Sequence, residues 1–208
     1  MFTGLVTDIG SVERLTRSTQ GLRLRIATAY DVTIIPKGAS IACAGVCLTV
    51  VETGKSGRSG WFEVEAVPQT LALSTLGDIV QGAPINLERP LKMGDELGGH
   101  AVLGHVDGVA KIMSRQQDGG SVRFGFRAPG DLWRFIAAKG SVTLDGTSLT
   151  VTDVDGDEFG VAIIPHTLDV TTWRHRTVGD RVNLEIDVLA RYMQRLVETS
   201  TQIEKAGQ

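Results

Sequence analysis

The stretch GASIACAGVCLTV, at residues 38–50, returns about one hundred residues later as GSVTLDGTSLTV, at residues 140–151. Each copy has a central glycine, Gly45 or Gly146, and then a short apolar run that ends in Leu-Thr-Val. A glycine turn followed by such a run is typical of a strand entered through a tight turn. Self-similarity at a fixed offset is the signature of a repeated structural unit. The pair therefore predicts an internal duplication.

Further matches occur in the same order on both sides of this pair. The offset between matched residues stays between 97 and 101, which is the drift that short loop insertions produce. The matches are Gly4 and Val6 with Gly104 and Val106; Pro68, Thr70 and Leu71 with Pro165, Thr167 and Leu168; Gly82 with Gly179; and Asn86, Leu87 and Glu88 with Asn183, Leu184 and Glu185. They predict two units, residues 1–97 and 98–187, followed by a tail at 188–208.

Composition and charge narrow the class of protein. The chain has 208 residues, 42% of them hydrophobic, and a net charge of −3, which fits a globular protein of one or two domains. No run of like charges indicates nucleic acid or an anionic membrane as a partner, and no apolar run is long enough to cross a bilayer. Two cysteines, Cys43 and Cys47, cannot build a disulfide framework, so we expect a reducing, cytoplasmic compartment.

Each unit is predicted to be all-β. Glycine is abundant, with 25 residues, and it separates short runs in which apolar and polar residues alternate. Small barrels or sandwiches are built from such strands. We expect strands at residues 22–26, 47–51, 61–67, 121–126 and 148–151. A short helix is expected at residues 34–37, and a second at 131–139, where Asp131 is a suitable N-cap and Gly140 a suitable end.

The tail differs in kind from the two units. Residues 188–205 contain neither glycine nor proline, and a stripe of mainly apolar residues recurs there at spacings of four and three. The stripe consists of Leu189, Met193, Leu196, Ser200 and Ile203. This pattern predicts a helix with one narrow contact face. The face could pack on the chain's own domains or on copies of itself, and the residues leave both alternatives open.

Few residues carry an obvious chemical signal. The chain lacks a Walker A loop, a Gly-x-Gly-x-x-Gly run after a strand and a Gly-x-Ser-x-Gly elbow. His100 and His105 lie in the glycine-rich opening of the second unit, and histidine suits proton transfer at neutral pH. A metal would need further ligands from elsewhere, so none is expected. For His166 and His175 a surface or hydrogen-bonded role is favoured.

Matched positions in the two units carry unlike reactive groups. Cys47 is matched by Ser148, and Asp187 is matched by Arg89, so we expect the units to differ in role. Taken alone, a strand cysteine is more often a small buried hydrophobe than a nucleophile. Lys139, before a glycine, more often complements a helix end. The backbone of the Leu-Thr-Val strands could bind a planar heterocycle, and two such pockets imply two similar ligands.

Five motifs together resemble those of the alpha-chain type of riboflavin synthase, over essentially the whole chain. They are MFTGLV at 1–6, GVCLTV at 45–50, GGH at 98–100, DGTSLTV at 145–151 and NLEID at 183–187. The resemblance implies an all-β fold of two tandem six-stranded Greek-key barrels with a C-terminal α-helix. It also implies a homotrimer joined largely through these helices, and an association with lumazine synthase.

The reaction implied by the resemblance is the last step of riboflavin biosynthesis, a transferase reaction without metal or organic cofactor. Two molecules of 6,7-dimethyl-8-ribityllumazine dismutate, one giving a four-carbon unit and the other accepting it. The products are riboflavin and 5-amino-6-(D-ribitylamino)uracil. In the family the ligands stack between the N-terminal barrel of one subunit and the C-terminal barrel of a neighbour.

The resemblance also assigns roles to residues of this chain. Catalytic roles fall to Cys47, His100, His105, Lys139, Ser148 and Asp187. The first pocket is expected to comprise Phe2, Gly4, Val6, Ser40, Cys47, Leu48, Thr49, Glu65, Ala66, Val67, Pro68, Gln69 and Thr70. The second is expected to comprise Gly104, His105, Val106, Ser148, Thr150, Ile164, Pro165, His166 and Thr167. The substrate-binding set further includes Leu5, Lys139 and Leu149. The first nucleophile stays open among Cys47, water and a ribityl hydroxyl.

Three positions depart from the family pattern. Ala44 stands where asparagine is frequent, and Gln69 and His166 stand where glutamate is common. The last two departures bear on hydrogen bonds to the edge of the ring. A rival class is a non-catalytic lumazine- or flavin-binding protein of the same fold, which keeps the pocket but loses catalytic side chains. The retained cysteine, histidines and aspartate favour the enzyme.

Overall fold

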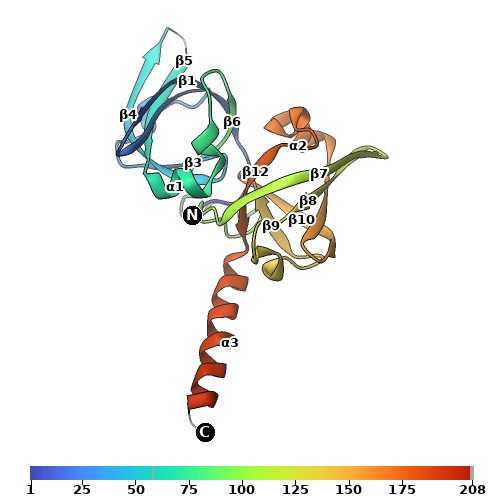
Figure 1. Ribbon diagram of the computed structural model, residues 1–208. Helices are drawn as coiled ribbons and strands as arrows, with labels where there is room; N and C mark the ends of the chain where they lie inside the picture. The colour runs from blue at the N-terminus through green and yellow to red at the C-terminus, as the bar shows by residue number, and fades with distance from the viewer. Residues whose placement is uncertain (58, 207–208) are drawn as a thin grey trace.

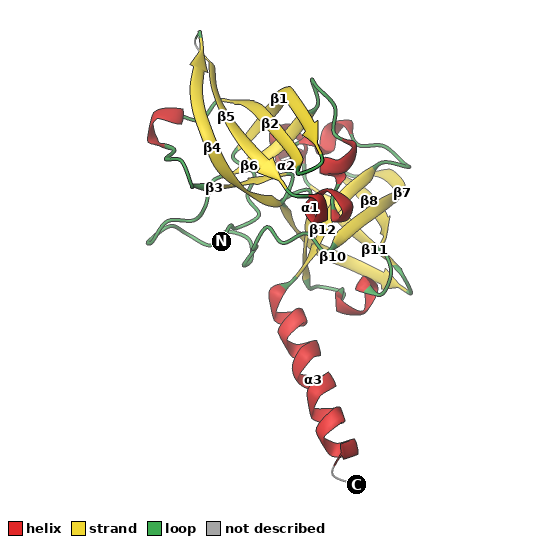
Figure 2. Ribbon diagram, turned by 60° about the vertical axis from the view of Figure 1, so that its left-hand side comes forward, coloured by secondary structure: helices red, strands yellow, loops and turns green. Residues whose placement is uncertain are grey.

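The structure, a computed structural model, describes residues 1–57 and 59–206, with side chains as far as residue 200. Within these residues the chain forms two closed β-barrels and one long C-terminal helix that projects away from both (Figure 1, Figure 2). The predicted all-β fold, its duplication and its helical tail are therefore confirmed.

Six strands close the first barrel in the order β1-β2-β5-β4-β3-β6, with β6 hydrogen bonded back to β1. The strands β3, β4 and β5 are successive antiparallel neighbours, and β2 lies beside β5, which is the Greek-key arrangement. Their bounds are β1 (Asp8–Ser18), β2 (Gly21–Thr28), β3 (Ser40–Cys43), β4 (Val46–Ser56), β5 (Ser59–Ala66) and β6 (Pro84–Glu88).

The second barrel repeats this order strand for strand, as β7-β8-β11-β10-β9-β12 with β12 paired back to β7. Its strands are β7 (Gly108–Asp118), β8 (Ser121–Arg127), β9 (Ser141–Leu144), β10 (Thr147–Asp155), β11 (Glu158–Ile163) and β12 (Arg181–Ile186). Alternation along each strand sends one set of side chains inward, and two separate apolar cores result. Trp173 is fully buried in the second core, where Phe124 and Phe126 meet its ring edge-on.

The short helices differ from those predicted. The helix expected at 34–37 is a 3-10 turn at Val32–Ile34, because Pro36 disfavours helical geometry in the residue before it. The helix expected at 131–139 is a 3-10 turn at Leu132–Phe135, because Ile136 is extended and Asp131 makes no capping bond. Two helices were not predicted, α1 (Pro68–Leu73) and α2 (Pro165–Val170), each of which begins at a proline after the last strand of a hairpin.

The two barrels meet through reciprocal contacts between their central glycines. A Cβ atom on Gly45 would lie 2.7 Å from the backbone nitrogen of Gly146, and a Cβ on Gly146 would lie 2.8 Å from that of Gly45. Neither position therefore has room for a side chain, which explains why both repeats carry glycine at the turn. The close approach holds the β3–β4 turn against the β9–β10 turn.

Two buried asparagines extend this interface symmetrically. The amide of Asn86 donates to the carbonyl of Asp145 at 2.9 Å, and its oxygen accepts from the backbone of Thr172 at 2.8 Å. The matched Asn183 donates to the carbonyl of Ala44 at 2.8 Å and accepts from the backbone of Thr75 at 2.7 Å. Each asparagine thus satisfies backbone groups of the opposite unit, which accounts for one of the repeated motifs.

The C-terminal helix α3 (Val188–Ala206) is fixed to the molecule at its first turns. Asp187 caps it by accepting from the backbone of Leu189 at 2.9 Å, and Arg191 pairs with Asp107 at 2.8 Å. Farther along, Met193 and Leu196 are each 66% exposed. Ile203, the last residue of the predicted stripe, lies beyond residue 200, where the description of side chains ends. Among the described helices, none is long and apolar enough to span a membrane.

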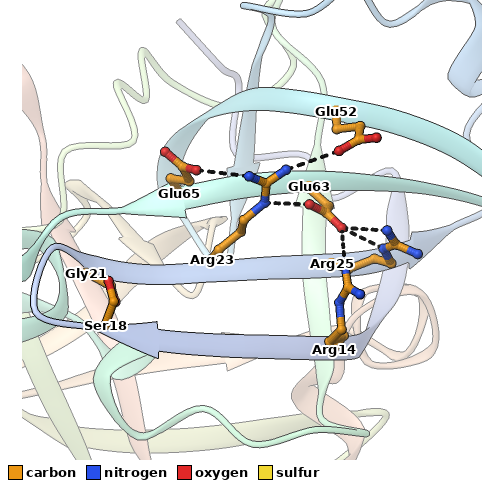
Figure 3. Close-up of polar contacts among 8 residues, drawn as sticks. All are labelled: Arg14, Ser18, Gly21, Arg23, Arg25, Glu52, Glu63 and Glu65. Carbon is orange, nitrogen blue, oxygen red and sulfur yellow. Dashed lines mark hydrogen bonds and ion pairs between the residues drawn. The ribbon is translucent and has the colours of Figure 1, made fainter.

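A network of ion pairs covers the outer face of the first barrel. Glu63 on β5 is 1% exposed, and it accepts from Arg14 on β1 and from Arg23 and Arg25 on β2 at 2.5–2.8 Å (Figure 3). Arg23 also reaches Glu52 on β4. Three strands are thereby tied together through one carboxylate.

Candidate active site

Two short segments exchange places between the barrels. They are residues 2–6 and residues 102–106, here called the crossing segments, and each precedes the first strand of its own barrel. They run antiparallel and pair through Phe2 and Val102, with N···O distances of 2.7 and 3.1 Å. The backbone of Ser148 donates to the carbonyl of Gly4 at 2.8 Å, and that of Cys47 donates to the carbonyl of Gly104 at 2.9 Å. Each segment therefore lies on the other barrel.

The glycines in these segments are required by both backbone angle and space. Gly4 and Gly104 both have φ of +77°, a conformation that costs other residues strain. A Cβ on Gly4 would lie 2.5 Å from the Cβ of Ser148, and a Cβ on Gly104 would lie 2.5 Å from the Cβ of Cys47. The backbone of each crossing segment thus contacts the strand on which a reactive side chain sits.

This exchange corrects the predicted composition of the two pockets. Gly4 was expected with Cys47, and Gly104 with Ser148; both pairings are wrong, because each glycine contacts the other strand. Val106, expected in the second pocket, packs against the core of the first barrel. The repeat aligns residues by position in the sequence, whereas a segment that precedes a barrel can lie on either barrel. Phe2 does pack near Cys47, in a small buried cluster with Val102.

His100 and Ser148 form the polar centre of the second pocket. The Nδ1 atom of His100 lies 2.7 Å from the hydroxyl of Ser148, and its Nε2 atom lies 3.1 Å from the hydroxyl of Thr143. Burial lowers the pKa of His100, and the charge of Asp187 partly opposes this shift. The ring is therefore neutral at pH 7, with one nitrogen as donor and the other as acceptor. Such a ring can exchange a proton with the Ser148 hydroxyl.

The first pocket has a different chemical character. Cys47 is partly exposed on β4, and the residue opposite it on β3 is Ala42, whereas Thr143 is opposite Ser148. Beside it, Ser40 pairs with the exposed Thr49. Cys43, by contrast, is fully buried, and burial raises the pKa of its thiol, so it is unreactive. The accessible thiol is therefore that of Cys47. Its neighbouring strand carries Ala42, where the second barrel has the Thr143 hydroxyl that contacts His100.

The other predicted site residues fall into two groups. Leu48, Ala66 and Leu149 are buried in the barrel cores, so only their backbone could meet a ligand. The remaining residues are on the surface of the single chain, some of them partly covered: Leu5, Val6, Glu65, Val67, Pro68, Gln69, Thr70, His105, Lys139, Thr150, Ile164, Pro165, His166, Thr167 and Asp187. The segments 67–70 and 164–167 lie at matched places, at the start of α1 and α2.

Two buried glutamates near the site were not predicted as functional. Glu88 accepts from the backbone and hydroxyl of Thr3 at 2.7 and 2.8 Å, and from the backbone of Gly4 at 3.0 Å. Glu185 accepts from the backbone of Leu103 at 2.7 Å. The signal in the sequence is the repetition of Asn-Leu-Glu, which by itself shows only that the two units align. Thr143 carries no signal, because the first unit has Ala42 at its place.

The described residues contain no group of three or more histidine, cysteine, aspartate and glutamate side chains placed to hold a metal ion. The polar groups of the candidate site include hydroxyls, imidazoles, one thiol, the amine of Lys139, the carboxylate of Asp187 and backbone amides. These groups can bind and protonate an organic ring.

A tandem pair of six-stranded barrels with matched reactive side chains, Cys47 and Ser148, fits a duplicated lumazine-binding protein. The model of the lumazine binding domain matches this chain twice, at residues 3–90 and 103–187. Riboflavin synthase from Brucella abortus (strain 2308) is 57% identical over 95% of this chain and 98% of that protein. Riboflavin synthase from Schizosaccharomyces pombe is 39% identical over 95% of this chain and 94% of that protein. The chain belongs to the riboflavin synthase family, whose members are transferases.

Solved structures show the same fold in a more distant protein. LumP in complex with 6,7-dimethyl-8-(1'-D-ribityl) lumazine superposes with a TM-score of 0.76 at 22% identity, over 89% of this chain and 98% of that chain. LumP in complex with riboflavin gives a TM-score of 0.74 at 24% identity, over 89% of this chain and 99% of that chain. At this identity the similarity describes the fold alone.

Proposed function

We propose that this protein makes riboflavin from two molecules of 6,7-dimethyl-8-ribityllumazine, with one molecule held by each barrel. One molecule donates four carbon atoms and leaves as 5-amino-6-(D-ribitylamino)uracil. The other accepts them and becomes riboflavin, so the atoms balance without an external oxidant or reductant. The proposal agrees with the names of the curated relatives.

The observation that carries this proposal is the unlike chemistry of two matched pockets. A reaction between two copies of one substrate needs two similar binding faces, because the copies have the same shape. Donor and acceptor do opposite work, so the side chains must differ. The thiol of Cys47 beside Ala42, and the Ser148 hydroxyl bonded to His100, meet both conditions.

Roles for the site residues follow from their geometry and remain proposals. His100 is suited to move a proton through Ser148, because the two are hydrogen bonded and the ring is neutral. Cys47 is suited to add to a ring or to stand beside the atom that does. His105 is exposed within the crossing segment that lies on Cys47, and it is suited to remove a proton from a ring methyl group. Lys139 and Asp187 are suited to bind ribityl hydroxyls.

A homotrimer with its active site between subunits completes the proposal. Thr49, His105 and Thr150, which we assign to the two pockets, are exposed in the single chain. A second barrel placed over such a pocket would exclude water and stack the two rings, and proximity of this kind supplies much of a rate enhancement. In the apolar stripe of α3, Leu189, Met193 and Leu196 are also exposed, so this face can pair with copies of itself. Association with lumazine synthase, which would supply the substrate, stays a prediction.

The decisive experiment is to mix purified protein with the dimethyl lumazine and follow riboflavin by absorbance and chromatography. We expect one riboflavin for every two lumazines consumed. Tight binding without turnover would instead support the rival class, a lumazine-binding protein. Cys47→Ser and His105→Ala, compared with the buried-thiol control Cys43→Ala, should each slow turnover strongly. Normal rates in both would remove these residues from the mechanism.

A further inference from the structure

The buried carboxylates of Glu88 and Glu185 lie at matched ends of β6 and β12, and they are 5% and 3% exposed. Neither carboxylate forms an ion pair with a lysine or arginine among the residues that the structure describes. Their hydrogen-bond donors come instead from the crossing segments. A carboxylate can accept several hydrogen bonds but donate none, so it is well matched to a turn that presents successive N–H groups.

The donors to the two carboxylates begin at matched places, Thr3 and Leu103. Glu88 accepts three hydrogen bonds, whereas Glu185 accepts one, and its buried Oε2 atom has no hydrogen-bond partner among the described residues. Glu88 binds Thr3 through its backbone and hydroxyl and Gly4 through its backbone. Glu185 binds the backbone of Leu103. Burial raises the pKa of the Glu185 carboxyl, and the backbone N–H groups of Leu103, Gly104 and His105 oppose that shift. Each glutamate thus holds the crossing segment of its own unit by the backbone.

The consequence depends on where the held segment goes next. Leu103, held by Glu185 of the second barrel, is followed by Gly104, which receives the hydrogen bond from Cys47 of the first barrel. Gly4, held by Glu88 of the first barrel, receives the hydrogen bond from Ser148 of the second. We propose that Glu88 and Glu185 are positioning residues that act on the opposite barrel: Glu185 sets the wall of the Cys47 pocket, and Glu88 sets the wall of the Ser148 pocket.

This inference deepens the proposed function, on which it rests for the identity of the ligand, but its main test needs no turnover. The probe is the rate at which iodoacetamide alkylates Cys47 in the full-length protein at fixed pH. Cys43 is fully buried and serves as an internal measure of global opening. Both cysteines fall between Lys37 and Lys55, so tandem mass spectra of one tryptic peptide locate the adduct.

Glu185→Gln places an amide NH₂ among backbone N–H donors, which loosens the segment that covers Cys47. We expect alkylation of Cys47 to become about tenfold faster, with Cys43 still protected. The matched variant Glu88→Gln carries the same chemical change in the other unit. It should leave Cys47 within about twofold of wild type and instead shift the NMR titration of His100, which is bonded to Ser148.

Equal acceleration of Cys47 alkylation in both variants, or none in Glu185→Gln, would overturn the proposal. If either glutamine variant fails to fold, two milder changes replace it. Glu185→Asp keeps the charge but withdraws the carboxylate, and Thr3→Val removes the hydroxyl that donates to Glu88 and accepts from the backbone of Leu5. Glu185→Asp should accelerate the alkylation of Cys47, and Thr3→Val should shift the titration of His100, each by less than the matching glutamine variant. A wild-type protein that binds lumazine without turning it over would refute the proposed function and leave the alkylation result to decide this inference.

Discussion

Gly104 shows how much of the site depends on the absence of a side chain. Its φ of +77° and the 2.5 Å that would separate a new Cβ from the Cβ of Cys47 are two independent constraints. The first is shared with other glycines of the chain, among them Gly82, which has φ of +83° and open space for 4 Å around the place that a Cβ would take. The second is specific to the pocket.

Gly104→Ala should therefore cost more than Gly82→Ala. Both changes introduce backbone strain of about 1 kcal/mol. Only Gly104→Ala adds a steric clash with β4, which we expect to cost a further ~1–3 kcal/mol in the free energy of unfolding and most of the activity. Urea unfolding and turnover of the two variants test this. Equal free energies of unfolding for the two variants would show that β4 can move to accommodate a side chain at Gly104.

The second prediction at this scale concerns the protonation of His100. Burial holds its pKa below the ordinary value of about 6.5, so folding disfavours the imidazolium. The stability that this provides is present above pH 6.5 and is lost as the pH falls through the lowered pKa. Turnover should likewise be constant near pH 7 and decline as the pH falls through the lowered pKa of His100. His100→Gln should remove this acidic limb from the pH–rate profile; a limb that persists would assign it to another group.

At the scale of the element, β5 is held to β1 and β2 by the carboxylate of Glu63. Burial alone would raise the pKa of this group, but hydrogen bonds from Arg25, Arg23 and Arg14 hold it below its usual value (Figure 3). The matched place in the second barrel is Gly160, which has no side chain to pair, and Arg123 nearby pairs with Asp153, where both side chains are exposed. The outer faces of the two barrels have therefore diverged, although their strand order is the same.

Glu63→Gln should destabilise the protein by about 2 kcal/mol, because it leaves arginines facing a neutral buried amide; their partial exposure keeps the loss below that of a fully buried pair. The control Asp153→Asn removes an exposed pair and should cost under about 1 kcal/mol. Denaturant unfolding at pH 7 compares them. A loss in Glu63→Gln no greater than in the control would mean that solvent already screens the network.

On the scale of the whole molecule, the proposed trimer depends on α3. Leu196 is 66% exposed on a helix that projects away from both barrels beyond its first turns (Figure 1, Figure 2). Leu196→Glu should convert the proposed trimer to monomers and lower turnover at least about tenfold, because each pocket would lose the barrel that covers it. Arg195→Glu, one residue earlier, changes charge outside the stripe. Light scattering after size-exclusion chromatography should show a trimer for the control; a trimeric, active Leu196→Glu protein would contradict the role of α3.

The sequence predicted most where a rule is local. Central glycines such as Gly45 marked turns, and the absence of glycine in the tail marked α3. The helices α1 and α2 were not predicted, because six residues are too few to show the helical repeat of apolar positions. His100 and Ser148 lie 48 positions apart in the sequence. Because the segment that contains Gly4 lies on β10, together with the part of the chain beside that segment, the ring nitrogen of His100 comes within 2.7 Å of the Ser148 hydroxyl. No pattern in a repeat states which barrel a leading segment will lie on, since both choices align equally well.

The exchange of crossing segments also bears on ancestry. Two separate single-barrel chains could make the same reciprocal contact about a twofold axis, each placing its first residues on the other. A single-barrel chain of this kind would need a second copy to complete a pocket, because one wall of each pocket would come from the other copy. Joining two such barrels in one chain would preserve an interface of this kind and would allow its two halves to carry different residues. Cys47 and Ser148, which occupy the same position in the two repeats, are one such difference.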